Sequence, residues 1–323
     1  MLVHLTIFVW HRCSKSSSGR NCTRHRLAPR SMIEHAFGGG FMATYRIAAN
    51  MEFVRSADKD FGAGVQIAGE LGYKYVEPMV HTGWELLSEV HYFHSFSMEE
   101  DPLLMRDICA AAGVRVSSIS GHSPLMKPEA AVERLTKAIV FADANDSKFV
   151  NTDEMIKPEW MDDAEAHDAM RYSLKKAEMV ARRHGVHLCI EPHGVYTKTS
   201  EGLLKIVDLV PSPWIGVNWD TGNAYLAAAE DPYEALERVR DRVLHVHAKD
   251  ISYSHSEAER GKVTGTPVGC ACGEGVVDWE RVLRILDPLD RELFLSVECG
   301  TIDEAERSLA YLTKTAGNRL IQN

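Results

Sequence analysis

The chain has 323 residues, of which 45% are hydrophobic and 25% are charged, a composition typical of an ordinary globular protein. Its formal net charge of −10 argues against a broad surface for nucleic acid or acidic membranes, and no apolar run approaches the roughly 18 residues that cross a bilayer. Seven cysteines over this length form no disulfide framework, so we expect reduced thiols and a cytoplasmic protein without nucleic-acid or membrane partners.

Residues 1–41 differ in composition from the remainder of the chain. Six Arg and Lys side chains accompany a single acid, Glu34, among several Ser and a Gly-Gly-Gly tract. Such a segment favours an extension that is disordered, or translated from upstream of a functional start near Met42, and an organellar transit peptide is the alternative. We therefore predict a single catalytic domain over residues 42–323.

From Thr44 onward, a strand-like segment followed by a helix-like segment repeats eight times. Alternation of this kind predicts parallel strands joined by crossover helices, and eight units is the number that closes a (β/α)₈ barrel. A doubly wound open sheet is the alternative. The predicted strands are 45–53, 73–80, 114–122, 148–155, 186–194, 215–223, 243–250 and 293–300, and the predicted helices are 60–72, 101–113, 128–144, 163–185, 200–210, 231–242, 278–287 and 302–314.

Two connections are longer than the usual link between a strand and its helix. They cover residues 81–98 and 252–277, and both contain His together with aromatic or Gly-rich sequence. Because long loops at the active end of a barrel often carry function, we predict that they act as lid and substrate loops.

Each of the last four predicted strands ends in a side chain that can bind a metal. Residues two apart in a strand share a face, so each of these strands has one apolar face and one face that becomes polar toward its carboxyl end. In a parallel barrel those ends surround one point, where the chemistry takes place. The side chains that we predict to converge there are Glu191, Asp220, His247 and Glu298.

Other polar residues stand near the ends of earlier strands. Glu77, His122 and Asp153 follow this pattern in the second, third and fourth units, so we expect them to line the pocket, with ordinary loop structure as the alternative. His245 lies two residues before His247 on the same face. We therefore expect His245 to hydrogen-bond a ligand from below rather than to be a fifth ligand.

The motifs EPHG, DTGN, HVHAKD, GEGVVDW and SVECG occur in this order. Together they resemble the sugar phosphate isomerase/epimerase family of xylose isomerase-like TIM barrels, over about residues 44–315. The resemblance implies a divalent metal ion, and three carboxylates with one imidazole suit Mn²⁺ first, with Mg²⁺, Co²⁺, Fe²⁺ or Zn²⁺ as alternatives. The implied ligands are Glu191, Asp220, His247 and Glu298.

The same resemblance implies an isomerase or epimerase that acts on a keto-sugar or sugar derivative. The enzyme would remove a proton beside a metal-bound carbonyl, with Glu191 and Glu298 as the proton-transfer pair and His193 as the alternative base. Lys249 would hold an anionic or enolate oxygen. The remaining residues that we expect to bind substrate are His122, Asn223, Asp153 and Glu77.

Two departures from the ketose 3-epimerases point away from simple epimerisation of a free ketose. Asn223 stands where those enzymes have His, and Thr197 stands where they have a substrate-binding Glu. The alternative is a metal-dependent lyase that eliminates the aglycone from a 3-oxo-glycoside, similar to the catalytic subunit of a C-glycoside deglycosidase, with His193 as its base. A homo-oligomer or a small partner subunit is compatible with either activity.

Two remote alternatives belong to other classes of protein. An apurinic-site endonuclease with three zinc ions would require further His ligands, one of them at Asn223, and a basic surface for DNA. A non-catalytic binding protein would bind no metal tightly, and it would exchange no sugar proton with solvent.

Overall fold

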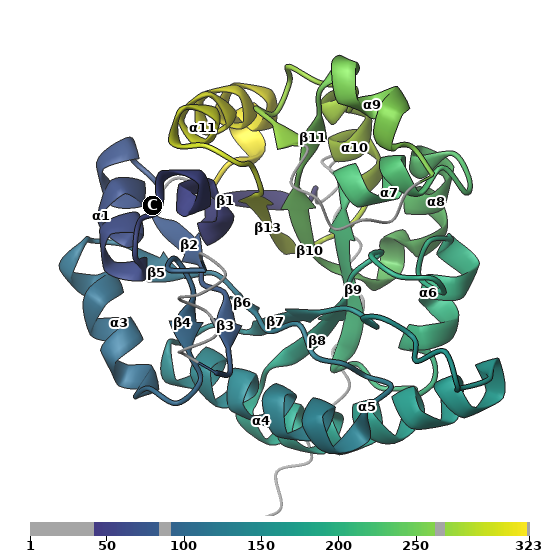
Figure 1. Ribbon diagram of the computed structural model, residues 1–323. Coiled ribbons are helices and arrows are strands. Elements are labelled where there is room, and N and C mark those ends of the chain that lie inside the picture. Colours follow the sequence, from purple (N-terminus) through teal and green to yellow (C-terminus); the bar gives the residue numbers. More distant parts are fainter. Residues whose placement is uncertain (1–41, 84–91, 262–268, 322–323) are drawn as a thin grey trace, which may run out of the picture. The chain divides into compact units, whose positions relative to one another are not determined.

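The computed structural model describes residues 42–83, 92–261 and 269–321, so the predicted extension over residues 1–41 lies outside the described residues. The predicted parallel barrel is confirmed, with the strands inside and the helices around them (Figure 1). Neighbouring strands follow the order β5-β2-β1-β13-β10-β9-β8-β7-β6. Their bounds are β1 Thr44–Asn50, β2 Tyr75–Glu77, β5 Arg115–Val116, β6 Ile119–Ser120, β7 Phe149–Thr152, β8 His187–Ile190, β9 Ile215–Asp220, β10 Val243–Ala248 and β13 Glu292–Val297.

The barrel closes at its third strand, which is interrupted. β5 pairs with β2 and β6 pairs with β7, so these two short strands are halves of one predicted strand and the nine strands form an eightfold barrel. Ser117 and Ser118 separate the halves. The Ser117 hydroxyl donates to the Val76 carbonyl oxygen at 3.0 Å, and the Ser118 hydroxyl lies 3.0 Å from His245 Nε2. Side-chain hydrogen bonds thus replace part of the backbone ladder here.

Helices on the outside of the barrel match the eight predicted helical segments. Most begin at an Asp or Thr whose side chain accepts a backbone N–H from the first turn, and Asp162 with Glu165 forms a complete capping box. None of the helices in the described part of the chain is both long and apolar enough to cross a membrane. Their bounds are α1 Phe61–Leu71, α3 Pro102–Ala111, α4 Pro128–Ala144, α5 Asp163–His184, α6 Ser200–Val207, α8 Pro232–Val239, α10 Trp279–Leu286 and α11 Ile302–Ala316.

The first predicted strand is shorter than expected. β1 ends at Asn50, whose side chain accepts the backbone N–H of Glu52 at 3.0 Å and so begins the 3-10 helix η1, Met51–Ala57. This early turn brings Glu52 and Arg55 to the mouth of the barrel, where they line a cavity.

Small elements at the carboxyl ends of the strands complete the described structure. Of the two predicted lid loops, residues 84–91 and 262–268 lie outside the described residues. The flanking parts form two small sheets, one parallel and one antiparallel. The small elements are β3 Val80–His81, β4 Phe96–Ser97, α7 Thr221–Ala227, β11 Asp250–Ile251, α9 Tyr253–Glu259 and β12 Gly269–Cys270, and two 3-10 turns, η2 Arg240–Arg242 and η3 Gly317–Arg319, lie elsewhere.

The GEGVVDW motif folds around a buried carboxylate, that of Asp250. This carboxylate accepts the backbone N–H groups of Gly273 and Val277 and the indole N–H of Trp279, at 2.8 to 3.0 Å. A Cβ at Gly275 would lie 2.3 Å from Asp250 Oδ1, so that position admits only Gly. The motif therefore has a structural role, which is to hold the loop after β12 beside the mouth of the barrel.

Candidate metal centre and its cavity

Four side chains converge at the carboxyl ends of the last four barrel strands. Glu191 follows β8, Asp220 ends β9, His247 lies in β10 and Glu298 follows β13. Each offers one ligand atom, and these four atoms all lie within 4.8 Å of one another. The convergence results from strand register, because His247 is paired with Asp220 on one side and with Ser296 on the other. The structure thus brings together the four residues that strand parity selected.

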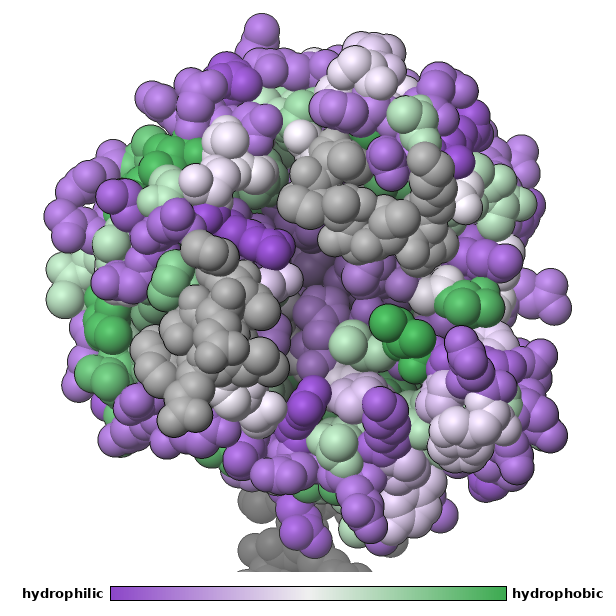
Figure 2. Space-filling view, viewed as in Figure 1, coloured by the Kyte–Doolittle hydropathy of each residue, from purple (hydrophilic) through white to green (hydrophobic). Residues whose placement is uncertain are grey.

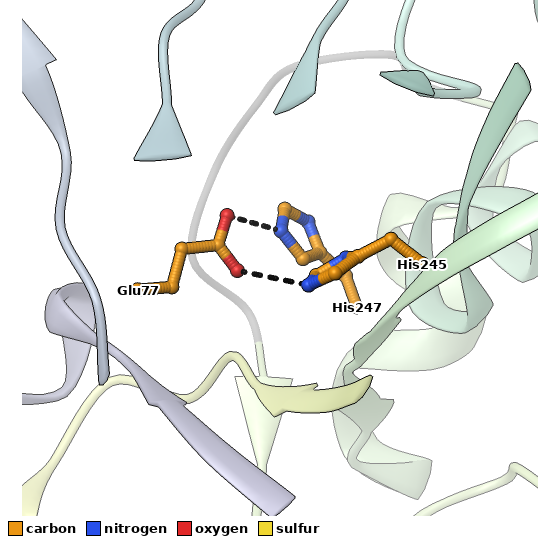
Figure 3. Close-up of side chains that lie close together, drawn as sticks. All are labelled: Glu77, His245 and His247. Carbon is orange, nitrogen blue, oxygen red and sulfur yellow. Dashed lines mark hydrogen bonds and ion pairs between the residues drawn. The ribbon is translucent and has the colours of Figure 1, made fainter. Parts of the chain in front are cut away.

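His247 is oriented by a fully buried carboxylate behind it. Its Nε2 lies 2.9 Å from Glu77 Oε1, while Nδ1 lies 3.1 Å from Glu191 Oε2 and 3.1 Å from Glu298 Oε2. Figure 3 shows the Glu77 carboxylate facing the rings of both His247 and His245. A hydrogen bond from Nε2–H to Glu77 leaves the Nδ1 lone pair directed at the other ligands, the arrangement usual for a metal-binding histidine.

The donor set fits a divalent cation. Asp220 Oδ2 and His247 Nδ1 are buried without a hydrogen-bond partner among the described residues. Burial raises the pKa of Asp220 to about 7, against the lowering effect of Lys249, because a third carboxylate is costly to ionise beside Glu298 and Glu191. A divalent cation would satisfy both orphaned atoms and relieve this repulsion, and the three carboxylates favour a hard or borderline ion.

Two asparagines and a histidine hold Glu191 in place. Asn218 Nδ2 donates to Glu191 Oε2 at 3.1 Å, and Asn223 Nδ2 donates to Glu191 Oε1 at 2.8 Å. Asn218 Oδ1 in turn lies 2.8 Å from His245 Nδ1, and His245 is completely buried. His245 thus reaches Glu191 only through Asn218, and not by the direct hydrogen bond to a ligand that the sequence led us to expect, whereas Asn223 contacts Glu191 directly.

Lys249 is the nearest cation to the cluster among the described residues. Its Nζ lies 2.7 Å from Glu298 Oε1, 3.2 Å from Asn223 Oδ1 and 3.8 Å from Asp220 Oδ2. Burial lowers the pKa of Lys249, but Glu298 and Asp220 raise it further, so the ammonium stays charged. The same ion pair outweighs burial and holds the pKa of Glu298 well below its usual range.

Three of the four side chains, those of Glu191, His247 and Glu298, line a cavity of about 210 Å³ that opens at the mouth of the barrel. Figure 2 shows a hollow near the centre of the face drawn, with hydrophilic residues at its wall. Glu77 does not line this cavity, contrary to our expectation. Its carboxylate lies behind the ring of His247, which separates it from any substrate in the cavity. The side chains that surround the remainder of the cavity include Asn50, Glu52, Arg55, Met79, His81, Tyr92, Ser120, His122, Asp153, Met155 and His193.

Two histidines on the cavity wall share one buried carboxylate. Asp153 Oδ2 lies 2.7 Å from His193 Nδ1, and Asp153 Oδ1 lies 3.4 Å from His122 Nδ1. Although burial lowers the pKa of His122, the charge of Asp153 raises it to about 9, and the hydrogen bond to Asp153 raises the pKa of His193. The carboxyl pKa of Asp153 is held well below its usual range, because the two imidazoles outweigh its burial.

The loop that carries His193 is fixed by residues that sequence reasoning missed. Glu154 accepts the backbone N–H groups of Tyr196 at 2.6 Å and Thr197 at 3.1 Å. The Thr197 hydroxyl accepts the backbone N–H groups of His193 at 3.1 Å and Gly194 at 2.9 Å. A Cβ at Gly194 would lie 2.1 Å from Glu154 Oε1, so the Gly of the EPHG motif makes room for this carboxylate.

Other supporting residues were also missed, although a signal for them existed. Asn218 lies two residues before Asp220, and Asn151 lies two residues before Asp153, so strand parity places both on the inner polar face. Asn151 Nδ2 donates to Glu77 Oε1 at 2.8 Å. Amides at these positions could have been identified as the partners of buried carboxylates.

The profile of the xylose isomerase-like TIM barrel family matches residues 65–315. The chain belongs to this family. Its relatives include sugar-processing enzymes, and the resemblance seen in the sequence motifs is therefore confirmed.

Two curated relatives by sequence are named as a decarboxylase and a dehydratase. The 3-oxo-isoapionate decarboxylase of Pectobacterium atrosepticum is 30% identical over 168 residues, which are 52% of this chain and 58% of that protein. The inosose dehydratase of Clostridium perfringens is 28% identical over 218 residues, 65% of each chain. The matched segments thus span less than two thirds of either relative.

Solved structures show the same fold at lower identity. A D-tagatose 3-epimerase-like protein superposes with a TM-score of 0.62 at 21% identity, covering 84% of this chain and 96% of that one. The IolI protein with a bound zinc atom gives a TM-score of 0.62 at 15% identity, covering 85% and 97%. A xylose isomerase-like TIM barrel protein from Mycobacterium smegmatis in complex with magnesium gives 0.64 at 17%, covering 86% and 98%.

Proposed function

We propose that this chain is a divalent-metal-dependent lyase that acts on a keto-sugar or keto-polyol. The enzyme removes a proton from the carbon beside the ketone and expels an oxygen substituent from the next carbon. The observation that carries this proposal is the 2.7 Å contact between His193 Nδ1 and Asp153 Oδ2, on the wall of a cavity that three of the four candidate ligands also line.

A divalent cation held by the four ligands would polarise the substrate carbonyl and so acidify the neighbouring C–H bond. His193 supplies the base, because Asp153 engages Nδ1 and leaves Nε2 for the substrate. Lys249 supplies a fixed positive charge in the same cavity, beside the place where negative charge develops on the substrate oxygen.

The names of the two sequence relatives support a lyase. A decarboxylation and a dehydration both break a bond to carbon without oxidation or hydrolysis, and both can pass through an enolate. An enolate beside a carbonyl is also what an isomerase or epimerase forms, so the three activities share the features of the site described above.

Isomerisation or epimerisation, which the sequence alone favoured, is the second candidate. It is supported by the approach of Glu191 and Glu298 to the same point from β8 and β13, where they could act on two faces of a substrate. Lys249 weakens Glu298 as a base, however, because the ion pair at 2.7 Å stabilises its charged form. Asn218 and Asn223 do the same for Glu191 by donating to both of its oxygens.

For the metal we propose Mn²⁺, with Mg²⁺, Co²⁺, Fe²⁺ and Zn²⁺ as alternatives. One imidazole among three carboxylates makes the site harder than the His- and Cys-rich sites typical of zinc. Dialysis against a chelator, followed by titration with each ion and elemental analysis of the bound metal, identifies the ion that binds and restores turnover.

The reaction is tested by incubating the metal-loaded protein in D₂O with ketoses, with inosose and with methyl 3-oxo-glucoside, followed by NMR. We expect an enone together with released water or methanol. Deuterium beside the carbonyl with every substituent retained would instead support the isomerase or epimerase. No exchange and no product with any of these compounds would contradict both candidates.

A further inference from the structure

We propose that His122 is a second catalytic residue, a general acid that protonates the departing oxygen while His193 removes the proton beside the ketone. This inference rests on the proposed lyase function and adds to it a second proton-transfer group. It also identifies the class of leaving group.

The geometry of the pair is the first support. His122 and His193 come from the loops after β6 and β8, yet their ring centroids lie 6.3 Å apart on one wall of the cavity. Each ring presents Nδ1 to Asp153, so the nitrogen left for a substrate is Nε2 in both. The His122 and His193 side chains are 21% and 29% exposed, against 2% for Asp153. All three side chains line the cavity, but the carboxylate is almost fully buried while both rings are partly exposed there.

The charge of the cluster is the second support. One buried carboxylate can neutralise one imidazolium, and it lies within reach of either ring. Before the reaction His122 carries the positive charge, and after it His193 does, so the net charge of the three groups does not change. A low-polarity site strongly disfavours any step that creates net charge, and this arrangement avoids such a step. The raised pKa of His122, about 9, agrees with a ring that starts in the protonated form.

The proposed elimination moves two protons and two electron pairs. His193 Nε2 takes the proton from the carbon beside the ketone, and the C–H electron pair becomes the new C=C bond. The C–O bond at the next carbon breaks, and its electron pair leaves with oxygen. The Nε2 proton of His122 moves to that oxygen, which departs as water or an alcohol. Exchange with solvent through the open mouth of the cavity returns both rings to their starting forms.

A general acid indicates what kind of group departs. Hydroxide and simple alkoxides are poor leaving groups that require a proton, whereas carbon dioxide and aryloxides depart without one. We therefore infer that the substrate is a keto-sugar or keto-polyol with a hydroxyl or alkoxyl group on the carbon β to the ketone.

The test compares two leaving groups on one sugar, methyl 3-oxo-glucoside and 4-nitrophenyl 3-oxo-glucoside, in the metal-loaded enzyme. General acid catalysis contributes about 10²–10⁴-fold, so H122N should slow release of methanol by that factor. It should change release of 4-nitrophenolate by less than about fivefold, because that anion needs no proton. Deuterium exchange beside the ketone should persist in H122N and disappear in H193N.

Further variants separate this role from a structural one. H184N is the matched control, since His184 forms a comparable contact with Asp143 at 2.7 Å on the surface, and it should change neither rate. H122Q, with a longer amide, should reproduce the selective loss, and release of 4-nitrophenolate itself reports that each variant is folded. An equal loss with both leaving groups, or no loss with either, would overturn the role of His122 and leave the lyase proposal standing. An absence of exchange and elimination in the wild-type enzyme would instead remove the lyase proposal.

Discussion

Glu77 Oε1 lies 2.9 Å from His247 Nε2, on the side of the ring opposite the three carboxylates. Glu77 is fully buried, and the positive charge of His247 outweighs that burial, so the pKa of the Glu77 carboxyl lies far below its usual range. The residue is therefore ionised at neutral pH. It accepts the N–H of a ring whose other nitrogen faces the candidate metal.

Replacing Glu77 should weaken metal binding without removing a ligand. E77L leaves the ring of His247 free to rotate or to change tautomer, and the loss of such a partner typically reduces metal affinity about 10–100-fold. Competition with a chromophoric chelator measures the dissociation constant. E133Q, at an exposed site on α4, is the control and should bind metal as the wild type does. Unchanged affinity in E77L would show that His247 needs no support.

Replacing a ligand should have a larger effect. D220N and E298Q should each bind less than a tenth of the wild-type metal, because each removes a charge from the cluster while preserving its shape. Elemental analysis after gel filtration gives the occupancy, and circular dichroism gives the fold. Because D220N also removes the carboxylate that is costly to ionise, we expect its metal-free form to unfold at the wild-type temperature or above. Full metal occupancy in both variants would place the ion elsewhere.

The fit between Gly194 and Glu154 predicts a coupled pair of substitutions. G194A should destabilise the protein by about 1–3 kcal/mol, as overpacking does, because the new methyl group would occupy the position of the carboxylate. E154A removes the obstacle, so the double variant should be less destabilised than the sum of the two single variants. Denaturant unfolding of all four proteins measures the cycle. Simple additivity would mean that the two side chains do not compete for space.

The ion pair between His122 and Asp153 predicts how stability depends on pH. The folded-state pKa of His122, about 9, lies above the unfolded value of about 6.5, so the pair stabilises the fold fully below pH 6.5. That contribution is lost as pH rises toward 9. In chelator-treated protein, the wild-type Tm should fall over this interval more steeply than that of H122N. Parallel curves would show that the charge on His122 does not stabilise the fold.

The architecture could be predicted because it depends on local patterns that repeat. Alternating strand and helix segments, with Asp or Thr at the helix starts, specify parallel strands, and eight units specify closure. The four candidate ligands followed from strand parity for the same reason. The GEGVVDW motif was informative as well, although its Gly275 packs against Asp250 of the HVHAKD motif and both residues serve the loop rather than the chemistry.

The other features of the fold and of the candidate site could not be predicted, because they depend on contacts between distant parts of the chain. Nothing local indicates that Ser118 meets His245 across the barrel and so interrupts the third strand. A carboxylate at the end of a strand can face the cavity or the back of a ligand, and only the packing of β2 against its neighbours places Glu77 behind His247. The sharing of Asp153 by His122 and His193 likewise depends on how three loops approach one another.

The position of His193 two residues after Glu191 has a consequence for how such an enzyme can change. One short stretch of backbone sets the spacing between the candidate ligand Glu191 and the proposed base His193, whichever residues form the other walls of the cavity. The walls contributed by η1 and by β3 can therefore be remodelled to admit a different sugar. The spacing between the candidate metal ligand and the proposed base would stay the same.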